Sequence, residues 1–212
     1  MSINFDNLSR VQKDIENNPL TELLIVTKNQ SPKDLVDLLK IGYRIFGENR
    51  VQEAKEKFTP LSNKYKLNLH LIGPLQTNKV RDALQLFDTI QSLDRPKLVD
   101  EIIKISKKIK NLKTKSFYIQ VNIGNEPQKN GVKKNSVQEF YNYIKSNNIR
   151  VDGLMCIPPN TEDPSSFFQE MYEIKSKMNP ELKLSMGMSN DYKYALAKKS
   201  NLIRIGSMIF NE

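Results

Sequence analysis

The sequence contains one cysteine, Cys156, one histidine, His70, and no tryptophan. A lone cysteine has no partner in the chain, and the opening segment MSINFDNLSR has no apolar core of signal-peptide length, so we expect a reducing, cytoplasmic location. One cysteine and one histidine also exclude a transition-metal site of the usual composition. A Ser-His-Asp triad would have to use His70, and no GxSxG segment is present. Glycine-rich phosphate loops of the Walker and Rossmann types are absent as well.

Long apolar runs and arginine are also scarce. No run approaches the ~20 residues of a membrane-spanning helix, so we expect no membrane partner. The net charge of +9 would favour polyanions, but its excess is lysine spread along predicted helices. A nucleic-acid-binding motif, an arginine cluster and interleaved aromatic residues are all missing. Nucleic-acid binding is therefore a distant alternative, which the salt dependence of binding would test.

Short apolar runs alternate with longer amphipathic segments after a polar leading helix within residues 1–18. Eight runs have the length and composition of strands, at residues 23–28, 44–48, 67–73, 89–93, 116–122, 151–157, 183–187 and 202–207. A helix-length segment follows each run, with periodic apolar positions such as Leu35, Leu38 and Leu39. This count predicts one α/β domain, residues 1–212, folded as a (β/α)₈ TIM barrel. An open doubly wound sheet is the alternative.

Alternating residues along the predicted strands indicate which face points into the barrel. In strand 116–122, Phe117, Ile119 and Val121 would face the helices, while Tyr118 and its alternate neighbours point inward. Unusual residues, including prolines and glycines besides polar types, gather at the C-terminal strand ends, the face where such barrels carry their sites. They are Lys28, Asn49, the GPLQTN segment 73–78, Asn122, Pro158, Pro159, Ser189, Gly206 and Ser207.

Lys28 ends the apolar run LLIVTKN, and the SPKD segment after it predicts a helix starting at Ser31. An ordinary explanation is a strand-terminal lysine whose ammonium reaches water. The alternative is a nucleophile, because an amine partly desolvated at a barrel rim can attack a carbonyl and form a Schiff base.

A second cluster indicates phosphate binding. Ser189 is predicted as the N-cap of the helix after strand 183–187, where free N–H groups and a hydroxyl can either cap the helix or bind an anion. Gly206 and Ser207 follow the last strand and supply a second hydroxyl. A ligand with an aldehyde for Lys28 and a phosphate for this cluster would be pyridoxal 5′-phosphate. Arg204 would then donate to the pyridine nitrogen, which leaves the ring a weak electron sink.

The motifs VTKN, FGENRVQEA, HLIGPLQTNK, GLM, LSMGMSND and IRIGSMIF closely resemble those of the pyridoxal-phosphate homeostasis proteins. These proteins are single-domain relatives of the alanine racemase barrel, and the resemblance spans essentially the whole chain. It implies a fold-type III barrel with Lys28 as the Schiff base and Asn49 near the ring. It also implies Arg204 on the ring nitrogen and Ser189, Gly206 and Ser207 on the phosphate. His70 and Met188 are further candidates near the ring. The chain ends in FNE where the family has FGxR, so the contacts of this tail are in doubt.

The resemblance implies an intracellular protein that stores, buffers or delivers pyridoxal 5′-phosphate without established catalysis. Apo-enzymes that need the cofactor would be its partners, and we expect a monomer. An amino-acid racemase is the alternative. That chemistry needs a second acid/base from a further domain, and the sequence given ends at Glu212, just past the eighth predicted strand. We therefore expect a carrier with little turnover.

Overall fold

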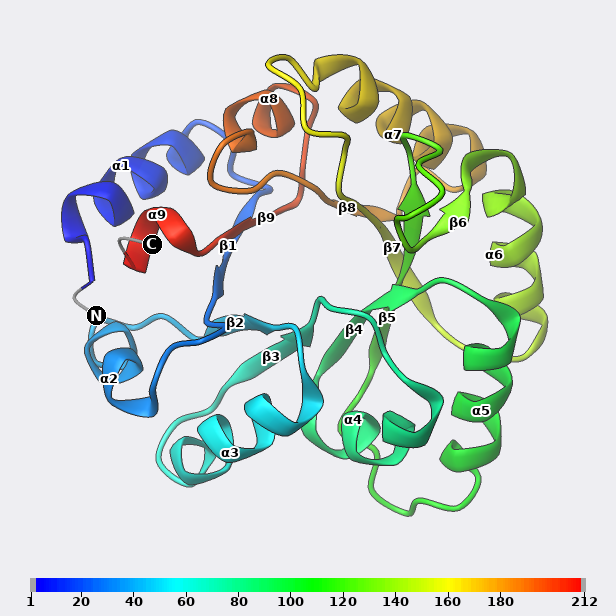
Figure 1. Ribbon diagram of the computed structural model, residues 1–212, viewed down its shortest axis with the longest axis horizontal. Helices are drawn as coiled ribbons and strands as arrows, with labels where there is room; N and C mark the ends of the chain where they lie inside the picture. Colours follow the sequence, from blue (N-terminus) through cyan, green and yellow to red (C-terminus); the bar gives the residue numbers. More distant parts are fainter. Residues whose placement is uncertain (1–2, 211–212) are drawn as a thin grey trace.

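Parallel strands close into a barrel in the computed structural model, which describes residues 3–210 (Figure 1). The order of hydrogen-bonded neighbours is β4-β3-β2-β1-β9-β8-β7-β5, and a further pairing of β4 with β5 closes the ring. Within residues 3–210 the predicted count of eight barrel strands is confirmed, and the open sheet is excluded. The barrel strands are β1 Glu22–Val26, β2 Ile45–Glu48, β3 Asn68–Leu71, β4 Thr89–Leu93, β5 Ser116–Asn122, β7 Val151–Cys156, β8 Lys183–Ser185 and β9 Leu202–Ile205.

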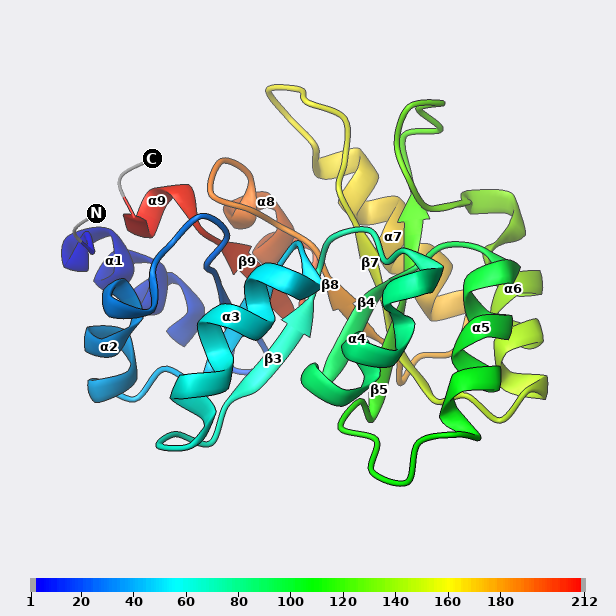
Figure 2. The same ribbon diagram turned by 60° about the horizontal axis from the view of Figure 1, so that its bottom comes forward.

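Helices surround the barrel on the outside (Figures 1 and 2). They are α1 Phe5–Glu16, α2 Pro32–Lys40, α3 Val51–Ser62, α4 Val80–Leu86, α5 Pro96–Ser106, α6 Val137–Ser146, α7 Ser165–Met178, α8 Tyr192–Ala197 and α9 Ser207–Phe210, with 3₁₀ turns η1 Thr77–Lys79 and η2 Lys134–Ser136. No helix in residues 3–210 is long and apolar enough to cross a membrane.

The predicted leading helix is α1, and it lies beside α9 at the other end of the chain (Figure 1). The backbone N–H of Asn4 donates to the carbonyl of Ile209 at 2.8 Å, and Asn7 Nδ2 donates to the carbonyl of Met208 at 2.8 Å. These bonds join the start of the first helix to α9, the short helix after the last strand. Residues 1, 2, 211 and 212, including the end of the divergent tail, lie outside the described part of the chain.

Local signals fix the helix starts. Pro32 occupies the first position of α2, and Ser31 and Asp34 form a reciprocal capping box there, which confirms the predicted start at Ser31. The helix then buries the predicted stripe of Leu35, Leu38 and Leu39 against the strands. Burial of such side chains drives helix docking at roughly 25 cal/mol per Å² of apolar surface.

The two faces of each strand differ as predicted. Phe117, Ile119 and Val121 of β5 belong to the core between barrel and helices, whereas Tyr118 lines a cavity inside the barrel. The barrel interior contains buried polar side chains, and these hydrogen-bond to one another across it. The inward face therefore carries specific polar contacts in place of the aliphatic layers common in such barrels.

Several strands end earlier than predicted, because the ladder pairing stops before the predicted C-terminal ends. The last strand residues are Val26 in β1, Leu71 in β3, Cys156 in β7, Ser185 in β8 and Ile205 in β9, and Lys28 lies in the turn after β1. A two-residue strand, β6 Val132–Lys133, adds to the edge of β5. Gly131 permits that approach, since a Cβ there would lie 2.6 Å from the backbone nitrogen of Asn122. A strand of only two residues is too short to show a periodic pattern in the sequence, so β6 was not predicted.

Candidate functional site

A cavity of about 470 Å³ lies at the C-terminal end of the barrel strands, and we call it the rim cavity. Loops after β1, β2, β7, β8 and β9 contribute to it. Its walls include Pro158 and Pro159 from the loop after β7. They also include the predicted site residues Lys28, Asn49, Met188, Ser189, Arg204, Gly206 and Ser207. The barrel thus brings together residues that are up to 179 positions apart in the sequence.

Lys28 enters the rim cavity from the turn after β1 and is half-buried. Within residues 3–210 its ammonium makes no hydrogen bond or ion pair. The next residue, Asn29, has a left-handed backbone with φ 61°, and its N–H donates to Glu53 Oε1 at 2.6 Å. This turn directs the Lys28 amine into the cavity and leaves it available to a ligand.

A buried ion pair holds the backbone on the other side of Lys28. Lys57 of α3, only 4% exposed, donates to Glu48 Oε1 at 2.6 Å, to Glu53 Oε1 at 3.0 Å and to the carbonyl of Thr27. The hydroxyl of Thr27 donates to the same Glu48 oxygen at 2.6 Å. Burial raises the pKa of Glu48, while the hydrogen bond from Lys57 opposes that shift. We refer to Thr27, Glu48, Glu53 and Lys57 as the clamp.

The clamp was not predicted, although the sequence contains a signal for it. Lys57 falls on the apolar stripe of α3 with Ala54, Phe58 and Leu61. A lysine on a core-facing stripe needs a buried partner, because an unpaired buried charge is strongly unfavourable. Glu48 in the GEN segment and Glu53 one helical turn before Lys57 supply the partners.

Asn49 follows β2 and is exposed at the rim. Gly73 determines how closely the next loop approaches it. A Cβ at Gly73 would lie 2.3 Å from the carbonyl oxygen and 2.7 Å from Cα of Asn49, so any side chain would displace this backbone. The glycine of the GPLQTN segment therefore positions Asn49.

Arg204 points inward from β9 and is 3% exposed. One guanidinium nitrogen donates to Ser185 Oγ and the other to the carbonyl of Cys156, each at 2.8 Å. Burial lowers the pKa of Arg204, but a guanidinium remains protonated in proteins and can only donate hydrogen bonds. Burial also raises the pKa of the Cys156 thiol to about 12, so this cysteine stays protonated.

Hydrogen-bond donors converge where the loop after β8 meets the start of α9, and we call this place the donor corner. The Ser207 hydroxyl donates to Ser189 Oγ at 3.1 Å, and the backbone N–H of Met208 donates to the same oxygen at 3.4 Å. Two donors thus converge on one point beside the cavity. Gly206 brings the loop close to β1, since a Cβ there would lie 3.1 Å from the carbonyl oxygen of Val26.

Two predictions about these residues need correction. Ser189 is not an N-cap, because α8 starts later, at Tyr192, with Asp191 as its N-cap. The N–H of Met188 donates to Asp191 Oδ1 at 2.5 Å, and this turn takes up the residues predicted as the first helical turn. His70 does not line the rim cavity, because it lies deeper in the barrel and faces a cavity at the opposite end. Its position does not support a place near a ligand ring, whereas Met188 lines the rim cavity.

The loop between β5 and β6 contributes a second lysine that was not predicted. Lys129 Nζ lines the rim cavity and donates to the carbonyl of Pro158 at 2.9 Å and to Glu126 Oε2 at 2.6 Å. Asn122 supports this loop through bonds to the carbonyls of Glu126 and Lys129 and does not line the cavity. Of the two lysines in the cavity, Lys129 is held by other groups and Lys28 is not.

Chemically, the rim cavity offers a free amine, a buried cationic donor and a corner of converging hydroxyl and N–H donors. It can accommodate a ligand with a carbonyl near Lys28, a hydrogen-bond acceptor near Arg204 and an anionic group at Ser189 and Ser207. Charge-assisted bonds at the last two positions would fix its orientation.

Residues 5–212 match the family described as alanine racemase, N-terminal domain. The pyridoxal phosphate homeostasis protein of Aquifex aeolicus is 36% identical, over 97% of this chain and 94% of the relative. The protein of the same name from Helicobacter pylori strain 26695 is 35% identical, over 91% of this chain and 88% of the relative.

Solved structures agree with these matches. PipY of Synechococcus elongatus with PLP bound superposes with a TM-score of 0.83 at 28% identity, covering 97% of this chain and 98% of PipY. An alanine racemase of Clostridium difficile has the same barrel, with a TM-score of 0.74 at 16% identity, covering 98% of this chain and 57% of the racemase. With its barrel and its near full-length relatives together, the chain belongs to the pyridoxal phosphate homeostasis protein family, whose fold is that of the alanine racemase N-terminal domain.

Proposed function

We propose that this protein binds pyridoxal 5′-phosphate in the rim cavity and acts in cofactor homeostasis by storing, buffering or delivering it. The observation that carries the proposal is the convergence of Lys28, Arg204, Ser189 and Ser207 on one cavity. The relatives' shared name and the PipY structure with PLP bound support it. We propose further that the chain acts in the cytoplasm, since the buried free thiol of Cys156 suits a reducing compartment. We also propose that it acts as a monomer.

The residues present fit the cofactor group by group. Ser207 Oγ and Met208 N–H already converge on an acceptor, Ser189 Oγ, and a phosphate oxygen can take that acceptor's place. Lys28 Nζ is unpaired within residues 3–210 and faces the same cavity, as an amine nucleophile for an aldehyde requires. Arg204 lines the same cavity and has further N–H donors, for which a pyridine nitrogen would be an acceptor.

The donor set also bears on chemistry. The bound cofactor supplies an aldehyde that reacts with amines and a ring that withdraws electrons. Arg204 can only donate hydrogen bonds, so it would leave the ring nitrogen unprotonated and that withdrawal weak. A carrier needs only retention and release, for which a weakly withdrawing ring suffices. The resemblance to alanine racemases at 16% identity extends to the fold alone.

A visible-absorption titration tests the proposal. Cofactor-free protein should acquire a visible band on addition of pyridoxal 5′-phosphate and lose it with hydroxylamine. Lys28→Ala should give no such band, because the only unengaged amine of the cavity is removed. Lys129→Ala is the matched control and should keep the band. Equal spectra for the wild type and Lys28→Ala would refute the proposal.

A further inference from the structure

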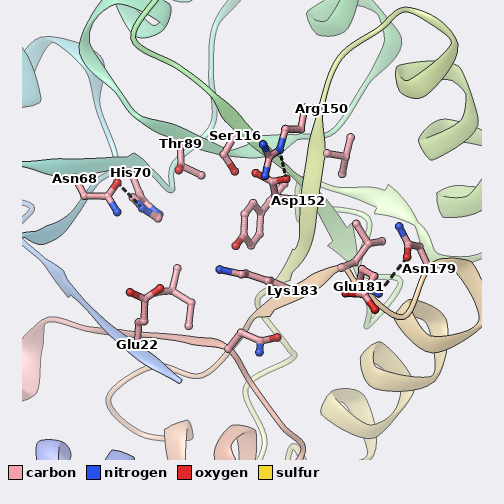
Figure 3. A pocket seen from close by; sticks show the side chains of 15 residues that line it. Glu22, Asn68, His70, Thr89, Ser116, Arg150, Asp152, Asn179, Glu181 and Lys183 are labelled. Carbon is pink, nitrogen blue, oxygen red and sulfur yellow. Dashed lines mark hydrogen bonds and ion pairs between the residues drawn. The ribbon is translucent and has the colours of Figure 1, made fainter. Parts of the chain in front are cut away.

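A second cavity of about 470 Å³ opens at the N-terminal end of the barrel strands, opposite the rim cavity (Figure 3). We call it the basal cavity. Its walls are the first inward residues of several strands, among them Glu22 of β1, Asn68 of β3 and Lys183 of β8. No residue of the rim cavity contributes to it. Its volume falls in the range of small-molecule sites, about 300–1,000 Å³.

Two opposite charges face the basal cavity without being paired. Figure 3 shows the ammonium of Lys183 and the carboxylate of Glu22 directed into the open space. Within residues 3–210 neither side chain forms an ion pair or a side-chain hydrogen bond. On the far wall Arg150 Nε lies 2.5 Å from Asp152 Oδ1, so that pair is satisfied. The exposed carboxylate of Glu181 also lines the cavity without a partner within residues 3–210, so the unpaired charges are one cation, Lys183, and two carboxylates, Glu22 and Glu181.

A buried phenol also points to a ligand. Tyr118 is 5% exposed and lines the cavity, yet its hydroxyl has no hydrogen-bond partner within residues 3–210. Gly153 makes room for the ring, because a Cβ there would lie 2.5 Å from Tyr118 Cε2. Burial and the nearby carboxylates of Asp152 and Glu22 raise the pKa of Tyr118, so the hydroxyl stays a donor. The ring is buried while the hydroxyl faces the open cavity, so a ligand oxygen there can accept its hydrogen bond.

A chain of hydrogen bonds links the basal cavity to Arg204. Arg204 donates to Ser185 Oγ at 2.8 Å, and the Ser185 hydroxyl donates to Gln91 Oε1 at 2.6 Å. Gln91 Nε2 lies 2.7 Å from His70 Nδ1, and His70 Nε2 lies 3.1 Å from Asn68 Oδ1. Both His70 and Asn68 line the basal cavity.

Chemistry sets the direction of this chain. Arginine can only donate hydrogen bonds, so the Ser185 hydroxyl accepts from Arg204 and donates its own hydrogen bond to the Gln91 oxygen. The Gln91 amide nitrogen then donates to Nδ1 of His70. His70 therefore carries its proton on Nε2 and donates to Asn68. Burial, with a smaller effect of the nearby Lys183 charge, lowers the pKa of His70 to about 4, so the ring is neutral. Each side chain between the two ends of this chain of hydrogen bonds accepts from one neighbour and donates to the next. A change of partner at either end therefore affects the hydrogen bonds along the whole chain.

We infer that the basal cavity binds a small zwitterion of the amino-acid type, and that its occupancy is coupled to Arg204 through the Asn68–His70–Gln91–Ser185 chain. A ligand carboxylate would contact Lys183 and the Tyr118 hydroxyl, and a ligand ammonium would contact Glu22. Two cationic and three anionic side chains line the cavity. A simple anion would meet the carboxylates and a simple cation would meet Lys183, whereas a zwitterion satisfies both charges.

The binding arm uses cofactor-free protein and does not depend on the proposed function. His70 is the only histidine, so a preparation with a histidine-free tag gives one set of imidazole signals in NMR. The common amino acids, added singly at millimolar concentration, are the probes. At least one should shift the His70 signals saturably, whereas propionate and ethylamine, which each lack one charge, should not. Absence of a saturable shift with every amino acid would overturn the site, as would equal binding of propionate or ethylamine.

Charge variants sharpen this arm. Lys183→Gln and Glu22→Gln should each weaken the saturable shift about tenfold or more, because each removes one charge-assisted contact. Lys115→Gln is the matched control, since Lys115 is an exposed lysine just before β5 that does not line the cavity. It should leave the affinity unchanged. Equal affinities in Lys183→Gln and Lys115→Gln would overturn the assignment.

The coupling arm rests on the proposed function. Pyridoxine 5′-phosphate is the probe for the rim cavity, because it lacks the aldehyde and does not react with amino acids. Its affinity should change about fivefold or more when the basal cavity is saturated, and the amino acid's affinity should change by the same factor. Gln91→Met should abolish the coupling while both ligands still bind. Equal affinities in the presence and absence of the other ligand would overturn the coupling, whereas failure of pyridoxine 5′-phosphate to bind would count against the proposed function instead.

Discussion

At the scale of single residues, Lys57 is the side chain on which the position of Lys28 depends. It is buried with Glu48 and also holds the carbonyl of Thr27, the residue before Lys28. A partner removed from a buried ion pair leaves the other charge uncompensated. The clamp thus combines a role in stability with a role in presenting the amine.

Lys57→Met should lower the free energy of unfolding by about 3 kcal/mol at neutral pH, because Glu48 is left buried and unpaired. Urea denaturation measures this. The control Lys55→Met, at an exposed position of the same helix, should change stability by less than about 0.5 kcal/mol. The double variant Glu48→Gln with Lys57→Met should recover part of the loss. A loss in the double variant equal to that in Lys57→Met would contradict the clamp.

The pH dependence of Lys57→Met follows from the same carboxyl. Burial raises the pKa of Glu48, and the loss of Lys57 removes the opposing hydrogen bond. A carboxyl whose pKa is higher in the folded than in the unfolded state takes up a proton on folding, so stability falls as pH rises. The defect of Lys57→Met should therefore be smaller at pH 5 than at pH 8. A defect that grows on acidification would exclude an uncompensated Glu48 as its cause.

At the scale of elements, the loop after β8 and the start of α9 form the donor corner, in which hydrogen-bond donors converge. We predict that phosphate supplies most of the retention, because hydrogen bonds to a charged group are each worth about 1.5–3 kcal/mol. Pyridoxal should therefore bind far more weakly than pyridoxal 5′-phosphate, and Ser207→Ala should weaken only the phosphate form, by about tenfold. Fluorescence or absorption titration measures both. Similar affinities for the two forms would place the phosphate elsewhere.

Much of the element scale was predictable from the sequence. The alternation of residues along strand 116–122 predicted its inward and outward faces. The regular succession of strand-length and helix-length segments predicted the barrel, because both patterns follow from burial of apolar side chains. The rim location of Lys28 and Ser207 followed from parallel strands ending on one face. The N-cap at Ser189 was wrong because the Met188–Asp191 turn, set by local hydrogen bonds, delays the helix.

Contacts between distant elements could not be predicted from the sequence. The pairing of Lys57 with Glu48 depends on how α3 packs on β2, and the bond between His70 and Gln91 depends on the register of β3 and β4. Strand periodicity shows only that His70 points inward. It does not show how far along the barrel axis His70 lies from the rim, which is why its predicted place near the ring was not supported.

At the scale of the whole molecule, the barrel carries two cavities at opposite ends, joined through a polar interior. We propose that the rim cavity holds an aldehyde and a phosphate, and we expect Arg204, which only donates hydrogen bonds, to limit the stabilisation of a carbanion there. The protein should therefore release cofactor more readily than it turns over amino acids. This is a property of the complete site and not of Lys28 alone.

Exchange of the α-hydrogen of alanine in heavy water, followed by NMR with cofactor-loaded protein, tests that property. Exchange should stay well below ~1 s⁻¹, the lower end of typical enzyme rates. Transfer of the cofactor to an added apo-enzyme should proceed under the same conditions. Faster exchange that disappears in Lys28→Ala would favour the racemase alternative.

We propose that pyridoxal 5′-phosphate attaches to Lys28, and peptide mapping is the decisive test of this attachment. The loaded protein is reduced with borohydride, digested and analysed by mass spectrometry. The reduced cofactor should be found on the peptide that contains Lys28. Cofactor found chiefly on Lys129, the other lysine of the rim cavity, or on Lys79 beside the GPLQTN segment would contradict the claim.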